Sequence, residues 1–242
     1  MLDITRKTFE DAGRVDPLYA ALTQHDRRGG RWNEEEFYST GRREIDAVLQ
    51  ATDASGSVPR GTALDFGCGP GRLTLALADH FRQVIGVDIS SSMLETAKNA
   101  AKRDPGLLAR VQFLHNTQPD LRSVPSRSVD FVYSNITLQH VHPIATRAYI
   151  AEFVRILTED GVAVFQLPKR AGPGKGTVGR WLYDFRYCTL RRAWMRLRGR
   201  IPYEIHGLRP SEVEAIVATA GGRIETRTYA ARGGSFYEVR IR

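Results

Sequence analysis

Cysteine is scarce in this sequence: 242 residues contain two, Cys68 and Cys188. Two cysteines so far apart form neither a metal-binding pattern nor a disulfide framework, so a reducing compartment is expected. Runs of about 18 apolar residues are absent as well, which excludes a helix that spans a membrane. The opening MLDITRKTFED has no apolar core and is not expected to be a secretory signal. Together these absences favour a cytoplasmic protein.

Short apolar segments alternate with helical patterns along the middle of the chain. Strands are predicted at 62–66, 83–88, 111–115, 129–135 and 161–167. Helices are predicted at 72–81, 91–103 and 146–157, with a turn at 159–161. This alternation is typical of an α/β fold whose parallel sheet carries helices on both faces.

The flanks of this region have a different character. Residues 1–50 are predicted to be helical, with Asn33 as a helix N-cap, and the polar stretch 52–61 is predicted to be a linker. A helix at 210–220 precedes two strands around 231–235, which must be antiparallel because their connection is too short for a crossover. The chain is therefore divided into an N-terminal helical cap, a core, an insertion, and a C-terminal helix with a strand pair that completes the sheet (1–60, 61–168, 169–208 and 209–242).

A glycine-rich loop follows the first predicted strand, with Gly67, Gly69 and Gly71 in ALDFGCGPGRL. Ligands of open α/β sheets bind beyond the carboxyl ends of the strands, and glycine lets the backbone approach them closely. The second strand ends at Asp88, 23 residues after Asp65. An acid in this position can hydrogen-bond two ribose hydroxyls, so the ligand is expected to contain a ribose.

The loop departs from the dinucleotide-binding pattern. That pattern needs a third glycine where this sequence has Arg72, and Asp65 just before the loop would repel a pyrophosphate. A cationic ligand would instead be favoured. S-adenosylmethionine has a ribose, an ammonium and a sulfonium but no phosphate, and it satisfies both observations.

Several motifs, taken in order, resemble those of the class I S-adenosylmethionine-dependent methyltransferases. LDFGCGPGRLT is followed by VIGVDIS, by FLHNTQ at 113–118, and by SVDFVYSNITLQHVH at 128–142. The resemblance covers residues 60–170 and extends to the terminal strand pair. It implies a Rossmann-like open twisted sheet of seven mostly parallel strands with an antiparallel last strand. It also implies S-adenosylmethionine as cofactor, S-adenosylhomocysteine as product, and 61–168 as the cofactor-binding core.

The same resemblance implies roles for particular residues. Those expected to contact the methionine part and line the glycine loop are Asp65, Gly67, Cys68 and Gly69. Those expected at the ribose and the adenine are Asp88, Ile89, Met93, Asn116 and Thr117. Asn135 would face the cofactor or the acceptor, although turn chemistry is an alternative for both Asn116 and Asn135. The N-terminal helices would close over the cofactor with Trp32 and Phe37 against it.

Methyl transfer from a sulfonium is an in-line displacement that depends chiefly on holding the acceptor about 3–3.5 Å from the methyl carbon. An amine acceptor must only be neutral, whereas a hydroxyl gains from a general base. His140 and His206 are the candidate bases, and catalysis without a protein base is the alternative. An unperturbed His140 would titrate near pH 6.5. There is no run of metal-ligand carboxylates, so no metal is expected.

Acidic residues are nearly absent from residues 169–200, where ten Lys and Arg accompany one acid, Asp184. The whole chain carries a net charge of +8, so the basic balance belongs to this segment. An apolar stripe at helical spacing predicts a helix there: Tyr183, Tyr187, Leu190, Trp194 and Leu197. A cap helix, an anionic membrane contact through 180–200 and a pocket for an anionic or glycan-linked acceptor all remain open. Nucleic acid is disfavoured because no RNA-binding appendage accompanies the patch.

These observations predict a methyltransferase that acts on a small-molecule or glycolipid-like acceptor, at oxygen rather than nitrogen. An N-methyltransferase and a non-catalytic protein that binds the cofactor and serves as a partner are the alternatives. The expected location is the cytoplasm, with the inner membrane face as a surface for peripheral contact. The oligomeric state does not follow from the sequence.

Overall fold

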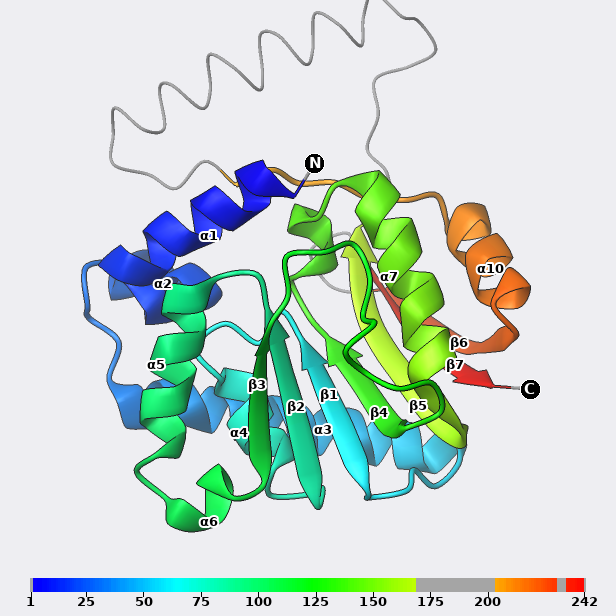
Figure 1. The fold of residues 1–242 in the computed structure, drawn as a ribbon, viewed down its shortest axis with the longest axis horizontal. Helices are drawn as coiled ribbons and strands as arrows, with labels where there is room; N and C mark the ends of the chain where they lie inside the picture. Colours follow the sequence, from blue (N-terminus) through cyan, green and yellow to red (C-terminus); the bar gives the residue numbers. More distant parts are fainter. Residues whose placement is uncertain (1, 169–202, 230–233, 242) are drawn as a thin grey trace, which may run out of the picture.

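The computed structural model describes residues 2–168, 203–229 and 234–241. Within these residues, seven strands form one sheet in the order β3-β2-β1-β4-β5-β7-β6 (Figure 1). The bounds of the strands are β1 (Thr62–Phe66), β2 (Gln83–Asp88), β3 (Val111–His115), β4 (Val129–Ser134), β5 (Leu157–Pro168), β6 (Gly222–Tyr229) and β7 (Gly234–Ile241). The basic insertion falls almost entirely outside the described residues.

The sheet is parallel except for its last strand in sequence. Strands β1 to β5 pair in parallel, and β7 runs antiparallel to both β5 and β6. The predicted fold class is therefore confirmed. Because the parallel strands share one direction, the residues that follow β1, β2, β3 and β4 meet at a single edge of the sheet.

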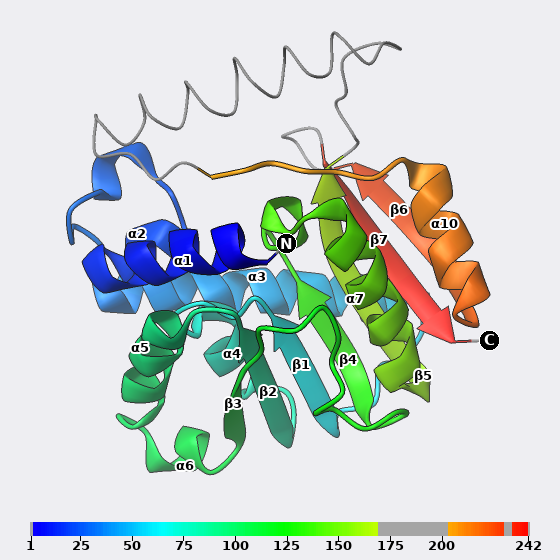
Figure 2. The same ribbon diagram turned by 45° about the horizontal axis from the view of Figure 1, so that its top comes forward.

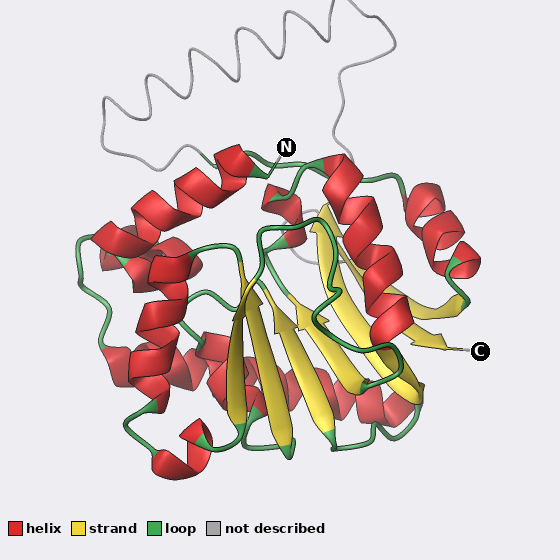
Figure 3. Cartoon of the chain, in the orientation of Figure 1, coloured by secondary structure: helices red, strands yellow, loops and turns green. Residues whose placement is uncertain are grey.

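Helices cover both faces of the sheet (Figure 3). Helices α3 and α4 pack on one face, and α7 and α10 pack on the other. The helix bounds are α1 (Asp3–Val15), α2 (Pro17–Ala21), α3 (Glu34–Ser55), α4 (Arg72–Leu77), α5 (Ser91–Ala101), α6 (Pro105–Leu108), α7 (Pro143–Ile156) and α10 (Pro210–Thr219). None of the helices in the described ranges combines the length and apolarity needed to cross a bilayer.

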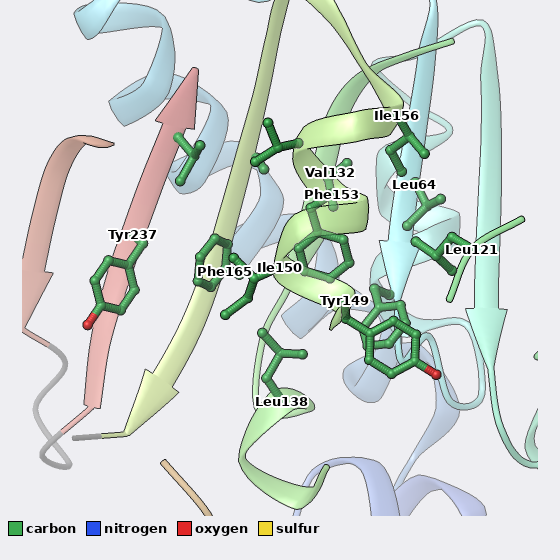
Figure 4. Packing of buried hydrophobic residues seen from close by; sticks show 14 of the residues in the cluster. Leu64, Leu121, Val132, Leu138, Tyr149, Ile150, Phe153, Ile156, Phe165 and Tyr237 are labelled. Carbon is green, nitrogen blue, oxygen red and sulfur yellow. The ribbon is translucent and has the colours of Figure 1, made fainter. Parts of the chain in front are cut away.

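The larger core lies between α7 and the sheet (Figure 4). Phe153 of α7 is fully buried there, and Phe165 of β5 stacks on Tyr237 of β7 with ring centroids 5.4 Å apart. Burying a side chain of this size contributes about 1.5–3 kcal/mol. This packing joins the C-terminal strands to the same sheet that carries the glycine loop.

Several boundaries differ from the sequence-based predictions. Helix α3 continues through Ser55, into the predicted linker, and α4 ends early, at Leu77. Helix α7 begins at Pro143, with the His142 ring accepting a hydrogen bond from the backbone N–H of Ile144 at 3.3 Å. Proline is favoured in this first helical position because its missing N–H has no helical partner there.

The turn predicted at 159–161 is instead an irregularity inside β5. The pairing of β4 with β5 passes from Val129 opposite Leu157 to Phe131 opposite Val162, so two residues along β4 correspond to five along β5. The extra residues are accommodated as a bulge, which interrupts the ladder locally without ending the strand. The turn-forming residues 159–161 therefore mark a real irregularity, but β5 begins before them, at Leu157.

Helix α1 lies across the carboxyl edge of the sheet (Figure 2). The Glu10 carboxylate accepts hydrogen bonds from the Ser90 hydroxyl at 2.9 Å and the Ser92 backbone N–H at 3.2 Å, at the start of α5. On the other side, the Thr5 hydroxyl donates to the His140 carbonyl at 3.1 Å. Helix α1 is thus attached to both sides of this edge.

Candidate active site

A pocket opens at the carboxyl edge of the sheet, beneath α1. Residues after four strands line it, together with Leu2, which precedes α1, and with Thr5 and Phe9 of α1. The predicted site residues in its wall are Gly67, Cys68, Gly69, Asp88, Ile89, Met93, Asn116, Asn135 and His140. Asp65, Thr117 and His206 do not belong to the lining.

The N-terminal helical contribution to this pocket differs from the sequence-based expectation. Trp32 and Phe37 are buried against each other, with ring centroids 5.5 Å apart, and neither lines the pocket. The aromatic residue that helix α1 contributes to the pocket wall is Phe9, which packs on His140 with a centroid distance of 5.4 Å. Trp32 just before α3 and Phe37 within it were the stronger sequence signal, but they serve to pack α3.

The glycines allow two close approaches of the backbone. Gly67 has a φ of +78°, and a Cβ there would meet the Thr137 side chain at 2.1 Å. Gly69 has a φ of +52° and lies in the pocket wall, with the Ala21 Cβ as its nearest neighbour at 3.7 Å. A side chain at either position would be strained, and one at Gly69 would also take up space that the ligand needs.

Asp88 both faces the pocket and fixes the glycine loop. One carboxylate oxygen accepts a hydrogen bond from the Gly69 N–H and the other from the Ser90 N–H, each at 2.8 Å. Burial raises the pKa of this carboxyl above its ordinary value. Each oxygen of a carboxylate has a further acceptor site, so ribose hydroxyls can still donate to it.

Asp65 lies under the loop rather than in the pocket wall. It is fully buried, one oxygen accepts a hydrogen bond from the Thr74 hydroxyl at 2.7 Å, and the other oxygen has no partner. Burial raises the pKa of the Asp65 carboxyl to about 7. Two carboxyl groups, Asp65 and Asp88, therefore stand close to the loop. This electrostatic setting fits a cationic ligand such as S-adenosylmethionine and disfavours a phosphate.

Asn116 takes the turn role that the sequence had left open. Its side-chain N–H₂ donates to the Asp120 carbonyl at 2.7 Å, and its oxygen accepts from the Gln118 N–H at 3.1 Å. The Tyr149 hydroxyl of α7 donates to the Gln118 carbonyl and supports the same loop. Asn116 still lines the pocket, whereas Thr117 is exposed outside it.

Glu44 of α3 is a site residue that the sequence analysis missed. One carboxylate oxygen accepts hydrogen bonds from the Asn135 side-chain N–H₂ at 2.7 Å and the Tyr133 hydroxyl at 2.9 Å. The other oxygen pairs with the Arg72 guanidinium at 2.9 Å. Arg72 and Asn135 both line the pocket, so Glu44 holds two of its walls in place. Three adjacent charges in TGRREI gave no sign of which one would turn inward.

His140 is in the pocket wall, but both its ring nitrogens are engaged. Nδ1 lies 2.7 Å from the Glu204 carbonyl, which can only accept, so Nδ1 carries the hydrogen. Nε2 then accepts from the Gln139 side-chain N–H₂ at 3.0 Å. Burial lowers the pKa of His140 to about 4. The prediction that His140 has an unperturbed pKa near 6.5 is therefore wrong, because its ring is buried against the rings of Phe9 and Tyr203.

His206, the second candidate base, lies beside the pocket and not in its lining. Its Nε2 pairs with the Glu204 carboxylate at 3.1 Å, and its ring lies 5.9 Å from that of His142. The backbone N–H of His206 donates to the Gln139 carbonyl at 2.7 Å. This segment therefore binds the loop that carries His140. A base role for His206 stays a prediction that the pocket lining does not support.

The buried state of His140 makes stability depend on pH. Unfolding exposes a ring that titrates near pH 6.5, so the unfolded chain binds more protons between about pH 4 and 6.5. The free energy of unfolding should then fall as pH falls through this window, by up to about 3 kcal/mol. Urea denaturation at several pH values measures this. Asp65, whose pKa is raised, makes the free energy of unfolding rise as pH falls. The test therefore compares the unaltered protein with His140→Gln, because both contain Asp65 and its contribution cancels. Parallel curves for the two proteins would contradict the prediction.

No group of three or more His, Cys, Asp or Glu side chains within residues 2–168, 203–229 and 234–241 could hold a metal ion. The predicted roles of residues 180–200, at a membrane or at the acceptor, fall on residues outside the described ranges.

Sequence comparisons place a methyltransferase domain on the part of the chain that carries this pocket. A family described as a methyltransferase domain matches residues 63–161. A trans-aconitate 2-methyltransferase of Azoarcus sp. (strain BH72) is 31% identical over 147 residues, which are 57% of this chain and 51% of that protein. A malonyl-acyl-carrier-protein O-methyltransferase of Enterobacter lignolyticus (strain SCF1) is 29% identical over 126 residues, 51% of this chain and 44% of that protein. The chain thus spans about half the length of these relatives.

Solved structures share the fold over the full chain. The magnesium protoporphyrin IX methyltransferase of Synechocystis PCC 6803 with bound S-adenosylhomocysteine superposes with a TM-score of 0.64 and 20% identity, covering 99% of this chain and 98% of that one. At this identity the likeness concerns the fold, while the sequence match concerns the region of the glycine loop and Asp88. The chain therefore has the fold of S-adenosylmethionine-dependent methyltransferases, and its strand-end pocket, flanked by carboxyl groups, lies within the region that matches a methyltransferase domain.

Proposed function

We propose that this protein transfers the methyl group of S-adenosylmethionine to a carboxylate oxygen of a small-molecule acceptor. The observation that carries the proposal is the state of His140, whose two ring nitrogens are both hydrogen-bonded. The relatives add support, because one is named for trans-aconitate, a carboxylate, and another for transfer to oxygen.

Acceptor groups differ in whether a proton must be removed from them during methyl transfer. A hydroxyl gains from a general base in the transition state, and a useful base has a pKa near the working pH. His140 is neutral at pH 7, but its pKa of about 4 makes it a weak base, and protonation would break the hydrogen bond from Gln139. A carboxylic acid ionises near pH 4, so at neutral pH its oxygen is already a nucleophile and needs no base.

The residues of the pocket then act by binding and orienting. S-adenosylmethionine, when bound, supplies the activated methyl group. Asp88 would accept the ribose hydroxyls, and Gly69 leaves room for the cofactor against the backbone. Asn135, held by Glu44, and Thr137 follow β4 and line the pocket, and the acceptor would approach the methyl carbon in line beside them. Positioning of this kind can supply much of the rate enhancement.

The chemistry of the product tests the proposal directly. The protein is incubated with methyl-tritiated S-adenosylmethionine and small-molecule extracts, with trans-aconitate as a defined probe. A methyl ester releases labelled methanol on mild alkaline hydrolysis, whereas a methyl ether or an N-methyl group keeps its label. We expect the transferred label to be volatile after base treatment. Label that survives the treatment would replace the proposal with ether formation or N-methylation.

The same assay yields a pH profile. With a carboxylate acceptor, the ratio of the wild-type rate to the rate of His140→Gln should vary less than about threefold between pH 6 and 8, because neither the acceptor nor His140 titrates there and both proteins keep Asp65, whose pKa is about 7. His140→Gln, which can keep both hydrogen bonds of the ring, should retain kcat within about tenfold. A rise through one ionisation near pH 6.5, lost in the variant, would instead restore His140 as the base, for which a 10²–10⁴-fold loss is typical.

A further inference from the structure

Ile136 is an unusual residue in the wall of the pocket. It follows Asn135 at the end of β4, and its φ of +59° lies in the left-handed region. Among the described non-glycine residues, Arg127 alone shares a positive φ. A β-branched side chain is poorly suited to this conformation, which glycine and asparagine adopt far more readily.

The neighbours of Ile136 impose this backbone conformation. The Ser134 hydroxyl donates to the Phe66 carbonyl at 3.0 Å, and the Asn135 side chain donates to Glu44 at 2.7 Å. On the other side, the Thr137 hydroxyl donates to the Asn135 carbonyl at 3.2 Å, and the Thr137 side chain fills the space that a Cβ at residue 67 would occupy. The turn is therefore held on both sides by groups other than the Ile136 side chain.

The fold gains little from an isoleucine here. The Ile136 side chain belongs to none of the buried apolar clusters of the described residues and is 39% exposed, whereas Leu138, two positions later, is fully buried. The residue thus combines a strained backbone with apolar surface left in a pocket. Strain of this kind clusters at functional sites, where a ligand uses the side chain.

The position of Ile136 favours the acceptor over the cofactor as that ligand. Ile89 and Met93 line the pocket near Asp88, where the adenosine part is expected. Ile136 follows β4, next to Thr137 and four residues before His140, in the part of the pocket wall where the proposed function places the acceptor. Apolar surface at this point would be covered by apolar atoms of the acceptor.

We propose that Ile136 is an acceptor-binding residue that packs against an apolar part of the acceptor, adjacent to the group that receives the methyl. This inference rests on the proposed function of the pocket and narrows its substrate class to amphipathic acids, in which a carboxylate is attached to an apolar chain or ring. Ile136 then determines which acids are accepted, and Asn135 and Glu44 set its position.

Calorimetry with hexanoate and 1-hexanol as probes, on the protein saturated with S-adenosylhomocysteine, tests the contact without turnover. Removing the side chain in Ile136→Gly should weaken hexanoate binding at least about tenfold, the effect of losing about two buried methylene groups. Ile136→Leu should restore the affinity to within about threefold. Affinity for S-adenosylhomocysteine should stay within about twofold in both variants.

The controls separate folding, cofactor and carboxylate effects. Ile136→Asn tolerates the left-handed backbone, so its thermal midpoint should equal or exceed that of the unaltered protein while hexanoate binding is lost. If 1-hexanol binds as tightly as hexanoate and loses the same affinity in the variants, the apolar contact with Ile136 stands. The carboxylate would then be removed from the proposed function. Absent hexanoate binding, equal binding by Ile136→Gly, or a matching loss of S-adenosylhomocysteine affinity would each overturn the proposal for Ile136.

Discussion

Replacing Asp88 by alanine should weaken the binding of S-adenosylmethionine and S-adenosylhomocysteine at least tenfold. Asp88 is placed to accept charge-assisted hydrogen bonds from the ribose, which are worth about 1.5–3 kcal/mol. Its carboxylate also accepts the backbone N–H groups of Gly69 and Ser90, each at 2.8 Å, so its loss frees the glycine loop as well. Titration calorimetry with S-adenosylhomocysteine measures the dissociation constant directly.

Two further variants define the origin of that loss. Asp88→Asn keeps one acceptor oxygen and should bind the cofactor product with an affinity between the two extremes. Glu95→Ala removes an exposed acid from α5, the helix that follows the same strand, and should leave the affinity within twofold. An unchanged dissociation constant for Asp88→Ala would remove the ribose assignment.

Replacing Glu44 by alanine should lower the free energy of unfolding by about 3 kcal/mol, near the lower end of values for breaking a buried ion pair. The change leaves the Arg72 guanidinium, whose side chain is 8% exposed, without the carboxylate that lies 2.9 Å away. It also leaves the Tyr133 hydroxyl and the Asn135 side chain without their acceptor. Urea denaturation with and without S-adenosylhomocysteine measures both the stability and the loss of cofactor affinity expected from a displaced pocket wall.

A double-mutant cycle tests whether the effect comes from the stranded charge. Glu44→Leu combined with Arg72→Met removes both charges, and an apolar replacement of a buried ion pair is often neutral or stabilising. The double variant should therefore be more stable than Glu44→Leu alone. Glu35→Ala, in the exposed first turn of α3, is the matched control and should change stability by less than about 0.5 kcal/mol. Additive effects of the two core changes would show that Glu44 and Arg72 act independently.

Local patterns in the sequence were enough to predict the centre of the fold and the main parts of the pocket. The alternation of strands and helices from residue 62 onward reflects side-chain periodicity, which acts over a few residues. The glycine loop and Asp88 each stand at the end of a predicted strand, and parallel pairing of β1 with β2 brings them together in register. This pairing brings the Asp88 carboxylate near enough to accept a hydrogen bond from the Gly69 N–H at 2.8 Å.

The wrong predictions concern segments in which contacts between distant parts of the chain override the local sequence pattern. The Glu159-Asp160-Gly161 turn lies inside β5 because β4 holds the strand on both sides of it. Trp32 and Phe37 were expected at the cofactor, yet the faces of the N-terminal helices are chosen by packing against the rest of the molecule. Asn116 is not among these, because it lines the pocket as expected while its short side chain also bonds within its own turn.

The sequence by itself determined the α/β fold, the nucleoside-binding edge and the charge that favours a sulfonium over a phosphate, because each depends on neighbouring residues or on one strand pairing. The tertiary structure alone decided the protonation of His140, since its partner Glu204 is 64 residues away and its burial comes from Phe9 of α1. It also decided that Glu44 supports the pocket, through Asn135, 91 residues later in the chain. A pKa and a buried ion pair depend on desolvation and on contacts between distant segments, which residue order does not encode locally.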